Sequence, residues 1–434
     1  MKFKLYLLSI ISVLVFSASS SVFAFQVIFT PGISGGEEFT DNLFVTKDDP
    51  KTEYITTLSP SARLELLWEL SGADIFYEPT YAYYNEYDEK NTWRHRVNYS
   101  GWAQITKNSR LDLRDNLIIT DDPFSEDDIA IIRTEDPFLP VDATNRRNRN
   151  RYAKNYANVS FKHQFGISDS FRLGYSHKLL ENEDPAIEDN ASNEPSAGIT
   201  YWFAPQWGMD VNASYTKSEY DTSDDIDRLH GTIKLLKKFT RNLDGFIGYS
   251  HTTVDYDGIR EDNKTYNPSI GFSYLIEEDI SLNVDVGFFI NDSENRSNQS
   301  GMTGDIRLIK RFERGSINLS AIGGYDSARF DTIEQNGFEK FAEGAVSATY
   351  KFTRYMSGNI NGAYRYSDYV DQGYQDDKFR GGLGVSLTPL KWLSLHLNYY
   401  YNLLESTDPA RGHEENSVMI RFSIAPSTPY RLNE

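Results

Sequence analysis

The 434-residue chain has no cysteine, an excess of acidic over basic residues, and no long apolar run beyond its first residues. Without cysteine it can form no disulfide, no thiolate metal site and no cysteine nucleophile. It has 63 Asp and Glu against 44 Lys and Arg, and the resulting net charge of -19 argues against a nucleic-acid partner, which needs a basic surface. Aromatic residues make up 14% of the chain, which excludes disorder over most of its length.

The N-terminus has the three regions of a secretory signal peptide. Lys2 and Lys4 precede an apolar stretch at residues 5–16, and the sequence VFA at 22–24 offers a small-x-small cleavage site. We therefore expect residues 1–24 to be removed, which takes away two lysines and changes the net charge from -19 to -21. A membrane-anchor helix fits less well, because spanning a bilayer takes about 20 apolar residues.

The rest of the chain repeats one pattern, in which apolar and polar residues alternate over segments of 11 to 14 residues. Residues 282–288 read Leu-Asn-Val-Asp-Val-Gly-Phe, and the segments 317–325 and 393–403 alternate in the same way. A period of two residues predicts β-strands with one apolar and one polar face. We find no second long apolar run, so a membrane location requires a barrel rather than helices.

Two classes of connection separate these segments. Nine short turns alternate with ten longer, acidic connections, and together they join twenty strands. This layout is typical of outer-membrane barrels, whose short turns face the periplasm and whose loops face outside. We predict an all-β, transmembrane, antiparallel up-and-down β-barrel over residues 25–424, followed by a short tail at 425–434. Eighteen strands are the alternative, because Pro31, Gly35 and Gly36 interrupt the first strand-like stretch.

A soluble β-sandwich or propeller is the other many-stranded interpretation. It fits less well because aromatic residues such as Trp68, Trp202 and Trp392 collect at the strand ends beside the short turns. Aromatic girdles at both membrane interfaces are typical of transmembrane barrels. The aromatics therefore favour the barrel.

Three short segments resemble a known family. They are Asp41-Asn42-Leu43-Phe44 before an acidic loop, TLSPS at 57–61, and the closing RFSIAPSTPYR around residues 422–431. They resemble the outer-membrane β-barrel family sometimes called beta-barrel porin 2, which includes barrels associated with exopolysaccharide biosynthesis and export. The resemblance implies a channel for saccharides, with polysaccharide export machinery as a partner. One departure is the tail, because such barrels commonly end on an aromatic assembly signal, whereas here the last strand-like aromatic is Phe422.

We expect the residues on the polar faces of the strands to line the lumen of the barrel. Fifteen basic and ten acidic residues fall on these faces, so the acidic excess must lie in the loops. Arginine rows provide forked donors for anionic or polyhydroxylated solutes, and they can equally form ion pairs that hold neighbouring strands in register. Both interpretations stay open. The principal lumen candidates are Arg63, Arg94, Arg96, Arg110, Arg114, Lys154, Arg172, Arg307, Arg365 and Arg380.

The connection at residues 122–149 is the longest. It contains Asp-Pro-Phe twice and an Ile-rich middle, and it ends in several arginines. Long loops with their own apolar residues are usually functional, so we predict that this one folds into or over the pore. The candidates for the constriction are Phe124, Phe138, Arg146 and Arg147. The other acidic loops lack calcium-ligand spacing, and we expect neither a metal nor a cofactor.

These patterns predict an outer-membrane channel that gives passive passage to polar solutes, in contact with lipid and lipopolysaccharide. Catalysis is not expected, because the seven histidines are isolated and no GxSxG motif is present. Two alternatives stay open. One is a structural or surface-interaction barrel without transport, and the other is an outer-membrane hydrolase with residues paired across strands.

Overall fold

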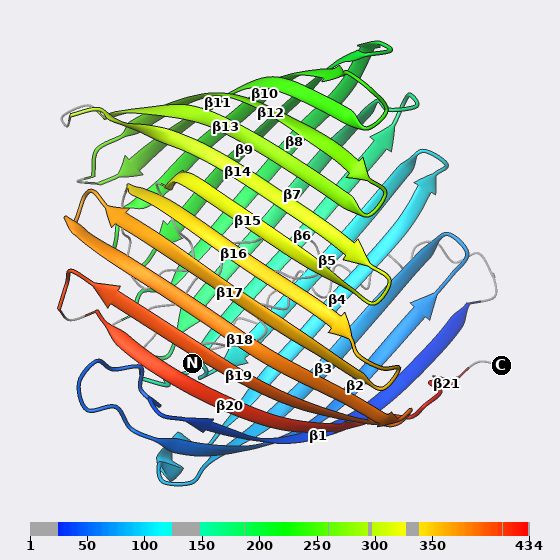
Figure 1. Ribbon diagram of the computed structural model, residues 1–434, viewed down its shortest axis with the longest axis vertical. Helices are drawn as coiled ribbons and strands as arrows, with labels where there is room; N and C mark the ends of the chain where they lie inside the picture. Colours follow the sequence, from blue (N-terminus) through cyan, green and yellow to red (C-terminus); the bar gives the residue numbers. More distant parts are fainter. Residues whose placement is uncertain are drawn as a thin grey trace.

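The computed structural model describes residues 25–123, 148–185, 187–258, 260–293, 297–326, 338–409 and 411–432. Within these residues, 21 strands form one continuous antiparallel sheet (Figure 1). No helix in the described ranges is long and apolar enough to cross a membrane. The elements are β1 (Gln26–Thr40), β2 (Glu53–Leu67), β3 (Ser71–Tyr84), η1 (Asp88–Lys90), β4 (Thr92–Thr106), β5 (Ser109–Thr120), β6 (Tyr152–Gln164), β7 (Ser170–Asn182), β8 (Asn190–Ala204), β9 (Trp207–Tyr220), β10 (Asp225–Lys238), β11 (Leu243–Asp257), β12 (Asn263–Glu277), β13 (Ile280–Ser293), β14 (Gln299–Phe312), β15 (Gly315–Asp326), β16 (Glu339–Lys351), β17 (Met356–Tyr369), β18 (Tyr374–Leu390), β19 (Leu393–Ser406), β20 (His413–Ile424) and β21 (Tyr430–Arg431).

The first and last long strands close the sheet into a barrel. Strand β1 pairs along its length with β2 and, from Ile33 to Thr40, with β20. Every other long strand pairs with its sequence neighbours, which is up-and-down topology. The prediction of an all-β, antiparallel barrel with twenty transmembrane strands is therefore confirmed, and the eighteen-stranded alternative is wrong.

Long and short connections alternate around the barrel as the sequence predicts. The strand ends that the long connections join all lie at one end of the barrel, which we call the loop end, and those that the short connections join lie at the other, the turn end (Figure 1). The twenty long strands have 12 to 17 residues. That is more than the 9–11 or so that a tilted strand needs to cross the hydrocarbon region.

The outward face of the sheet is a belt of exposed apolar side chains. Leu58, Ile199, Ile247 and Leu383 are 52%, 40%, 64% and 52% exposed, although each lies well inside a strand. Directly opposite residues of an antiparallel ladder share a face, so the register extends this belt around the barrel. The predicted alternation at 282–288 is confirmed, with the apolar positions outward and the polar positions inward.

The C-terminal tail returns to the wall. Strand β20 covers β1 only from Ile33 onward, and β21 pairs with β1 at Ile28 and Phe29. The Leu432 N–H continues this pairing by donating to the Val27 carbonyl at 2.9 Å. An uncovered strand edge presents unpaired backbone groups, so the tail caps the part of β1 that β20 leaves bare.

The seam between β1 and β20 is held at the loop end by one aspartate. The Asp41 carboxylate accepts hydrogen bonds from the backbone N–H of Asn416 (2.7 Å) and from its side-chain amide (2.8 Å). In return, the Asp41 N–H donates to the Asn416 carbonyl at 3.1 Å. This places the first residue of the Asp41-Asn42-Leu43-Phe44 motif at the point where the barrel closes.

We expect the substitution Asp41→Ala to weaken closure. It removes two charge-assisted hydrogen bonds, and each such bond contributes about 1.5–3 kcal/mol. Urea unfolding in detergent, followed by the gel mobility shift between folded and unfolded barrel, measures the loss. The control is Asp48→Ala, which removes the same charge from an exposed position in the same connection. Equal stability of the two variants would contradict a role of Asp41 in the seam.

Candidate functional site

The ladder register places the predicted basic residues on the inward face of the barrel. On β4, for example, Arg94 and Arg96 lie opposite Thr80 and Glu78 of β3, while Trp93 on the alternate face is 49% exposed. The same parity holds on the other strands. The inward basic residues are Arg63, Arg94, Arg96, Arg110, Arg114, Lys154, Arg172, Arg307, Arg365 and Arg380.

Most of these cations lie beside a carboxylate of the same wall. Such pairing makes the lumen polar but locally close to neutral. Four of the six pairs below join different strands, whereas Arg110–Asp112 and Arg307–Asp305 each lie within one strand. The pairing therefore favours the interpretation of the arginines as ion pairs that hold the wall in register. The nitrogen–oxygen distances are Arg63–Asp74 2.7 Å, Arg96–Glu78 3.6 Å, Arg110–Asp112 2.8 Å, Arg172–Asp210 3.2 Å, Arg307–Asp305 2.7 Å and Arg365–Glu343 3.2 Å.

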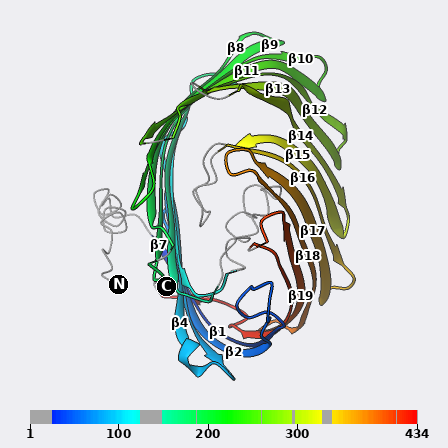
Figure 2. The same cartoon turned by 90° about the vertical axis from the view of Figure 1, so that its left-hand side faces the viewer.

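The connection between β1 and β2, residues 41–52, turns back into the barrel instead of extending outward. Figure 2, viewed from the loop end, shows this blue segment inside the outline of the sheet. Its Leu43 and Val45 are fully buried. Leu43 forms a small apolar core with Ile55, Ala82 and Tyr84. This first loop therefore occupies part of the lumen at the loop end.

Asn42 gives the loop its shape. Its side-chain amide donates to the carbonyls of Thr46 and Glu414, both at 2.7 Å, and its Oδ1 accepts the Thr46 N–H at 3.0 Å. These bonds close a turn and tie it to the start of β20. Phe44, two residues on, packs edge-to-face on Tyr87 with ring centroids 5.1 Å apart. The motif that carries the family resemblance is thus the part of the chain that folds the loop inward.

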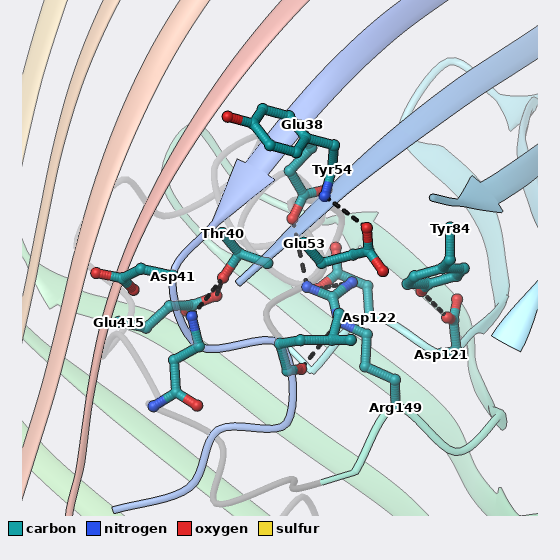
Figure 3. A network of polar contacts seen from close by, with 12 residues as sticks. Glu38, Thr40, Asp41, Glu53, Tyr54, Tyr84, Asp121, Asp122, Arg149 and Glu415 are labelled. Atoms are coloured by element: carbon teal, nitrogen blue, oxygen red, sulfur yellow. Dashed lines mark hydrogen bonds and ion pairs between the residues drawn. The ribbon is translucent and has the colours of Figure 1, made fainter. Parts of the chain in front are cut away.

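Arg149 fastens this loop to the wall (Figure 3). Its guanidinium donates to the Leu43 carbonyl at 3.2 Å and to Glu38 Oε1 at 3.3 Å, and it lies 3.8 Å from the Asp122 carboxylate. Arg149 is 3% exposed. Burial alone lowers its pKa, but the surrounding Tyr84, Glu38 and Asp122 outweigh burial and raise the pKa above the ordinary value, so Arg149 stays charged.

A second buried pair lies beside Arg149. Arg94 Nε donates to Asp121 Oδ1 at 2.6 Å, and the Tyr84 hydroxyl donates to the same carboxylate. Asp121 is 2% exposed. Burial favours its neutral form, but Arg94 and Arg149 and the hydrogen bonds from Arg94 and Tyr84 outweigh burial, so the pKa of Asp121 is lowered.

Glu53 anchors the next connection, residues 85–91. Its carboxylate accepts the backbone N–H groups of Asn85, Glu86 and Tyr87 at 3.1 to 3.2 Å, as well as that of Tyr54 at 2.7 Å. Glu53 is 1% exposed. Sequence reasoning did not single out Glu38, Glu53 or Glu415, which are buried carboxyl groups of this loop-end cluster. No local pattern distinguishes them from the other strand-end acids.

The four constriction candidates, Phe124, Phe138, Arg146 and Arg147, lie outside the described residues. The described ends of the same connection, at Asp122 and Arg149, lie inside the barrel against Glu38. The connection therefore leaves and rejoins the wall on its inward side.

A polar cavity of about 660 Å³ lies at the loop end, across the lumen from the β1–β5 cluster. Amide side chains of Asn263, Asn291 and Gln299 line it, together with the rings of Tyr256 and Phe338. Amides both donate and accept hydrogen bonds, and rings present flat apolar surfaces. Its remaining polar lining includes Arg260, Glu261, Asp371 and Gln372. The arrangement offers mixed hydrogen-bonding groups with both signs of charge, and it suits a hydroxyl-rich solute.

Comparison with known proteins gives a partial family match and a fold match. A family model described as "Putative MetA-pathway of phenol degradation" matches residues 181–308. No curated protein matches the chain. Among solved structures, the FrpB iron transporter from Neisseria meningitidis (F5-1 variant) is 8% identical with a TM-score of 0.52, over 92% of this chain and 82% of that one. OccAB3 from Acinetobacter baumannii is 10% identical with a TM-score of 0.42, over 92% of this chain and 99% of that one.

At these identities the structural likeness concerns the fold alone. The closed ladder, the outward apolar belt and the inward polar face together define an outer-membrane β-barrel. The chain is therefore located in the bacterial outer membrane. The finer resemblance to exopolysaccharide-associated barrels stays a prediction, as does removal of residues 1–24.

We expect Arg149→Met to release the 41–52 loop. The variant leaves Glu38 buried without its cation, and breaking a buried pair in this way costs about 3–5 kcal/mol. Hydrogen–deuterium exchange of peptides covering 41–52 should accelerate, while that of the turn-end peptides stays unchanged. The control is Arg241→Met at an exposed position of the turn end. Unchanged exchange at 41–52 in Arg149→Met would contradict the anchoring role.

The lowered pKa of Asp121 predicts how its contribution depends on pH. A depressed folded-state pKa means that the ionised carboxylate stabilises the fold fully above the ordinary value of about 3.9. That contribution falls as the pH drops past this value and is lost below the folded-state pKa. Unfolding free energies of the wild type and Asp121→Asn should therefore differ by a constant amount from pH 7 to about 5 and converge in stronger acid. If the difference in unfolding free energy between the wild type and Asp121→Asn grew as the pH fell, the lowered pKa of Asp121 would be contradicted.

Proposed function

We propose that the barrel is a passive channel for polar solutes across the outer membrane, selecting by width and by the groups that line it. The observation that carries the proposal is the closed ring of twenty long strands with a polar inward face. A barrel of that size is too wide for side chains alone to fill, since about eight strands already leave just enough room for them. The lumen therefore holds water, loops or both.

Saccharides are the solute class that the lining supports best. Most of the wall cations are paired with carboxylates, so the lumen has little unpaired positive charge to attract a strong anion. The loop-end cavity offers amides, hydroxyls and two rings, which suit neutral polyhydroxylated compounds. The resemblance of the 41–44 and 57–61 motifs to exopolysaccharide-associated barrels points the same way, and with it polysaccharide export machinery as a partner.

The loops that fold into the barrel set the width of the passage. Residues 41–52 occupy one side of the loop end and are fixed there by Asn42 and Arg149. The connection at 122–149 leaves and rejoins the wall beside them. In this proposal both segments narrow the passage, so transport depends on solute size as well as on polarity.

Two other functions stay in competition. A barrel without transport is favoured by the same inward loop, since a plugged lumen leaves only surface interactions. Small aromatic solutes are favoured by the phenol-degradation description of the matching family model and by Tyr256 and Phe338 in the cavity. An outer-membrane hydrolase has no comparable observation in its favour.

Planar-bilayer recordings of the purified barrel separate these functions. The proposal predicts stable single-channel conductance that neutral oligosaccharides reduce in a concentration-dependent way, whereas benzoate does not. Absence of any conductance would favour the structural barrel. Reduction by benzoate but not by oligosaccharides would favour aromatic solutes.

The cavity can be tested with Gln372→Ala. Gln372 lies on an exposed connection and lines the cavity, so the variant removes a hydrogen-bonding group with little risk to the fold. Loss of one hydrogen bond of about 0.5–1.5 kcal/mol should weaken oligosaccharide binding, measured by the reduction of conductance, by about 2- to 10-fold. Gln206→Ala at the exposed turn end is the matched control. If the two variants respond alike to oligosaccharide, the cavity is not a saccharide site.

Deletion of residues 126–146 tests the predicted constriction. A loop that narrows the pore yields a larger single-channel conductance when it is removed. The gel mobility shift of the folded barrel checks that the variant still assembles. Unchanged conductance in a folded deletion variant refutes the constriction.

A further inference from the structure

The outward wall formed by β4–β8 contains an aspartate in the middle of the apolar belt. Asp115 lies halfway along the 12-residue β5, opposite Tyr99 of β4 and Ala157 of β6. Leu113 and Leu117 precede and follow it on the same outward face. By contrast, the outward acids Asp227, Asp377 and Glu414 lie within three residues of the loop ends of their strands.

Other polar side chains surround Asp115 on this wall. Asn155 Nδ2 donates to Asp115 Oδ1 at 2.6 Å. His177 Nδ1 lies 3.0 Å from Asn193 Oδ1, and the Tyr175 hydroxyl donates to the same oxygen at 2.7 Å. We call Asp115, Asn155, His177 and Asn193 the outer polar patch. It runs across four neighbouring strands, β5 to β8.

Such a patch is unfavourable against lipid tails. Ionisable residues at membrane depth are costly and rare, and in general they face protein or water rather than hydrocarbon. The internal hydrogen bonds satisfy only part of the capacity of a carboxylate and two amides. A protein surface placed over the patch can supply the remaining partners, whereas acyl chains cannot.

The composition of the wall favours a second copy of this chain as that surface. On β4–β8, all of which the structure describes, the outward positions include no lysine or arginine, so the wall is poorly suited to lipopolysaccharide phosphates. The patch contains an anion, an imidazole and two amides, and is therefore self-complementary. An isologous contact needs this property, because the same surface meets itself.

The shape and area of the β4–β8 wall are also compatible with contact between two copies of the chain. Figure 2 shows β4 and β7 along the straight side of the outline, and a straight stretch of wall allows two barrels to lie against each other. Five strands about 4.8 Å apart span about 24 Å. Over a belt about 25 Å tall, the wall offers about 600 Å² per copy. The pair then buries about 1,200 Å², at the lower limit of stable interfaces.

We propose that two copies of this barrel associate through the outward faces of β4–β8, with the outer polar patch of each covered by the other. The small, exposed Ala197 on the outward face of β8 allows the two walls to approach closely beside the patch. The inference is independent of the solute that the channel passes.

The absence of cysteine makes the test direct, because a single introduced cysteine is the only one in the chain. Tyr99→Cys and Ala197→Cys are each oxidised in native outer membranes. The control is Ala321→Cys, which is outward on β15 of the opposite wall, beside the exposed Ile306. The proposal predicts a disulfide-linked dimer of this chain for at least one patch variant and a several-fold smaller amount for the control.

Charge substitutions give the second measurement. Ala197→Arg and Ala321→Arg each place an arginine at an exposed outward position, so both carry a similar cost against lipid. Only Ala197→Arg should change the native mass from dimer to monomer, with the gel mobility shift confirming that both barrels are folded. A monomeric wild type, equal cross-linking on both walls, or cross-links only to a different protein would each overturn the proposal.

Discussion

A backbone amide inside a bilayer has no water to bond with, so the hydrogen-bond ladder of this chain must close on itself. The pairing of β1 with β20 completes the ring, and β21 covers the part of β1 that β20 does not reach. Closure of the barrel also gives each strand one face toward lipid and one face toward the lumen. Along each strand, the face toward lipid is mostly apolar and the face toward the lumen is mostly polar. A mean hydropathy of -0.54 follows from that alternation.

The same constraint determines where charge can lie. Most cations on the inward wall lie beside carboxylates of the same wall, where water in the lumen screens each pair. At the loop end the pairing goes further. Arg149 joins Glu38, Asp122 and the Leu43 carbonyl, and so holds the first loop inside the barrel. The interactions that stabilise the wall are therefore the ones that shape the passage.

Sequence alone predicted the features that depend on local pattern. Alternation located the strands, the two classes of connection gave twenty, and strand parity placed Arg63, Arg172 and Arg365 on the inward face. What it did not predict depends on contacts between distant residues. Glu38 and Arg149 are 111 residues apart, and Asp41 and Asn416 are 375 apart. No spacing rule pairs them, so the inward fold of residues 41–52 and the role of the tail became apparent only in three dimensions.

We propose that a water-filled path of limited width runs through this barrel. Osmotic swelling of proteoliposomes in neutral sugars of increasing size tests it most directly, because swelling requires the sugar itself to cross. We expect rapid swelling with a monosaccharide and a steep decline with each added sugar unit. In Arg149→Met, which frees the 41–52 loop, this decline should shift to larger sugars. No swelling with any sugar, in proteoliposomes whose barrel is verified as folded, would contradict the account.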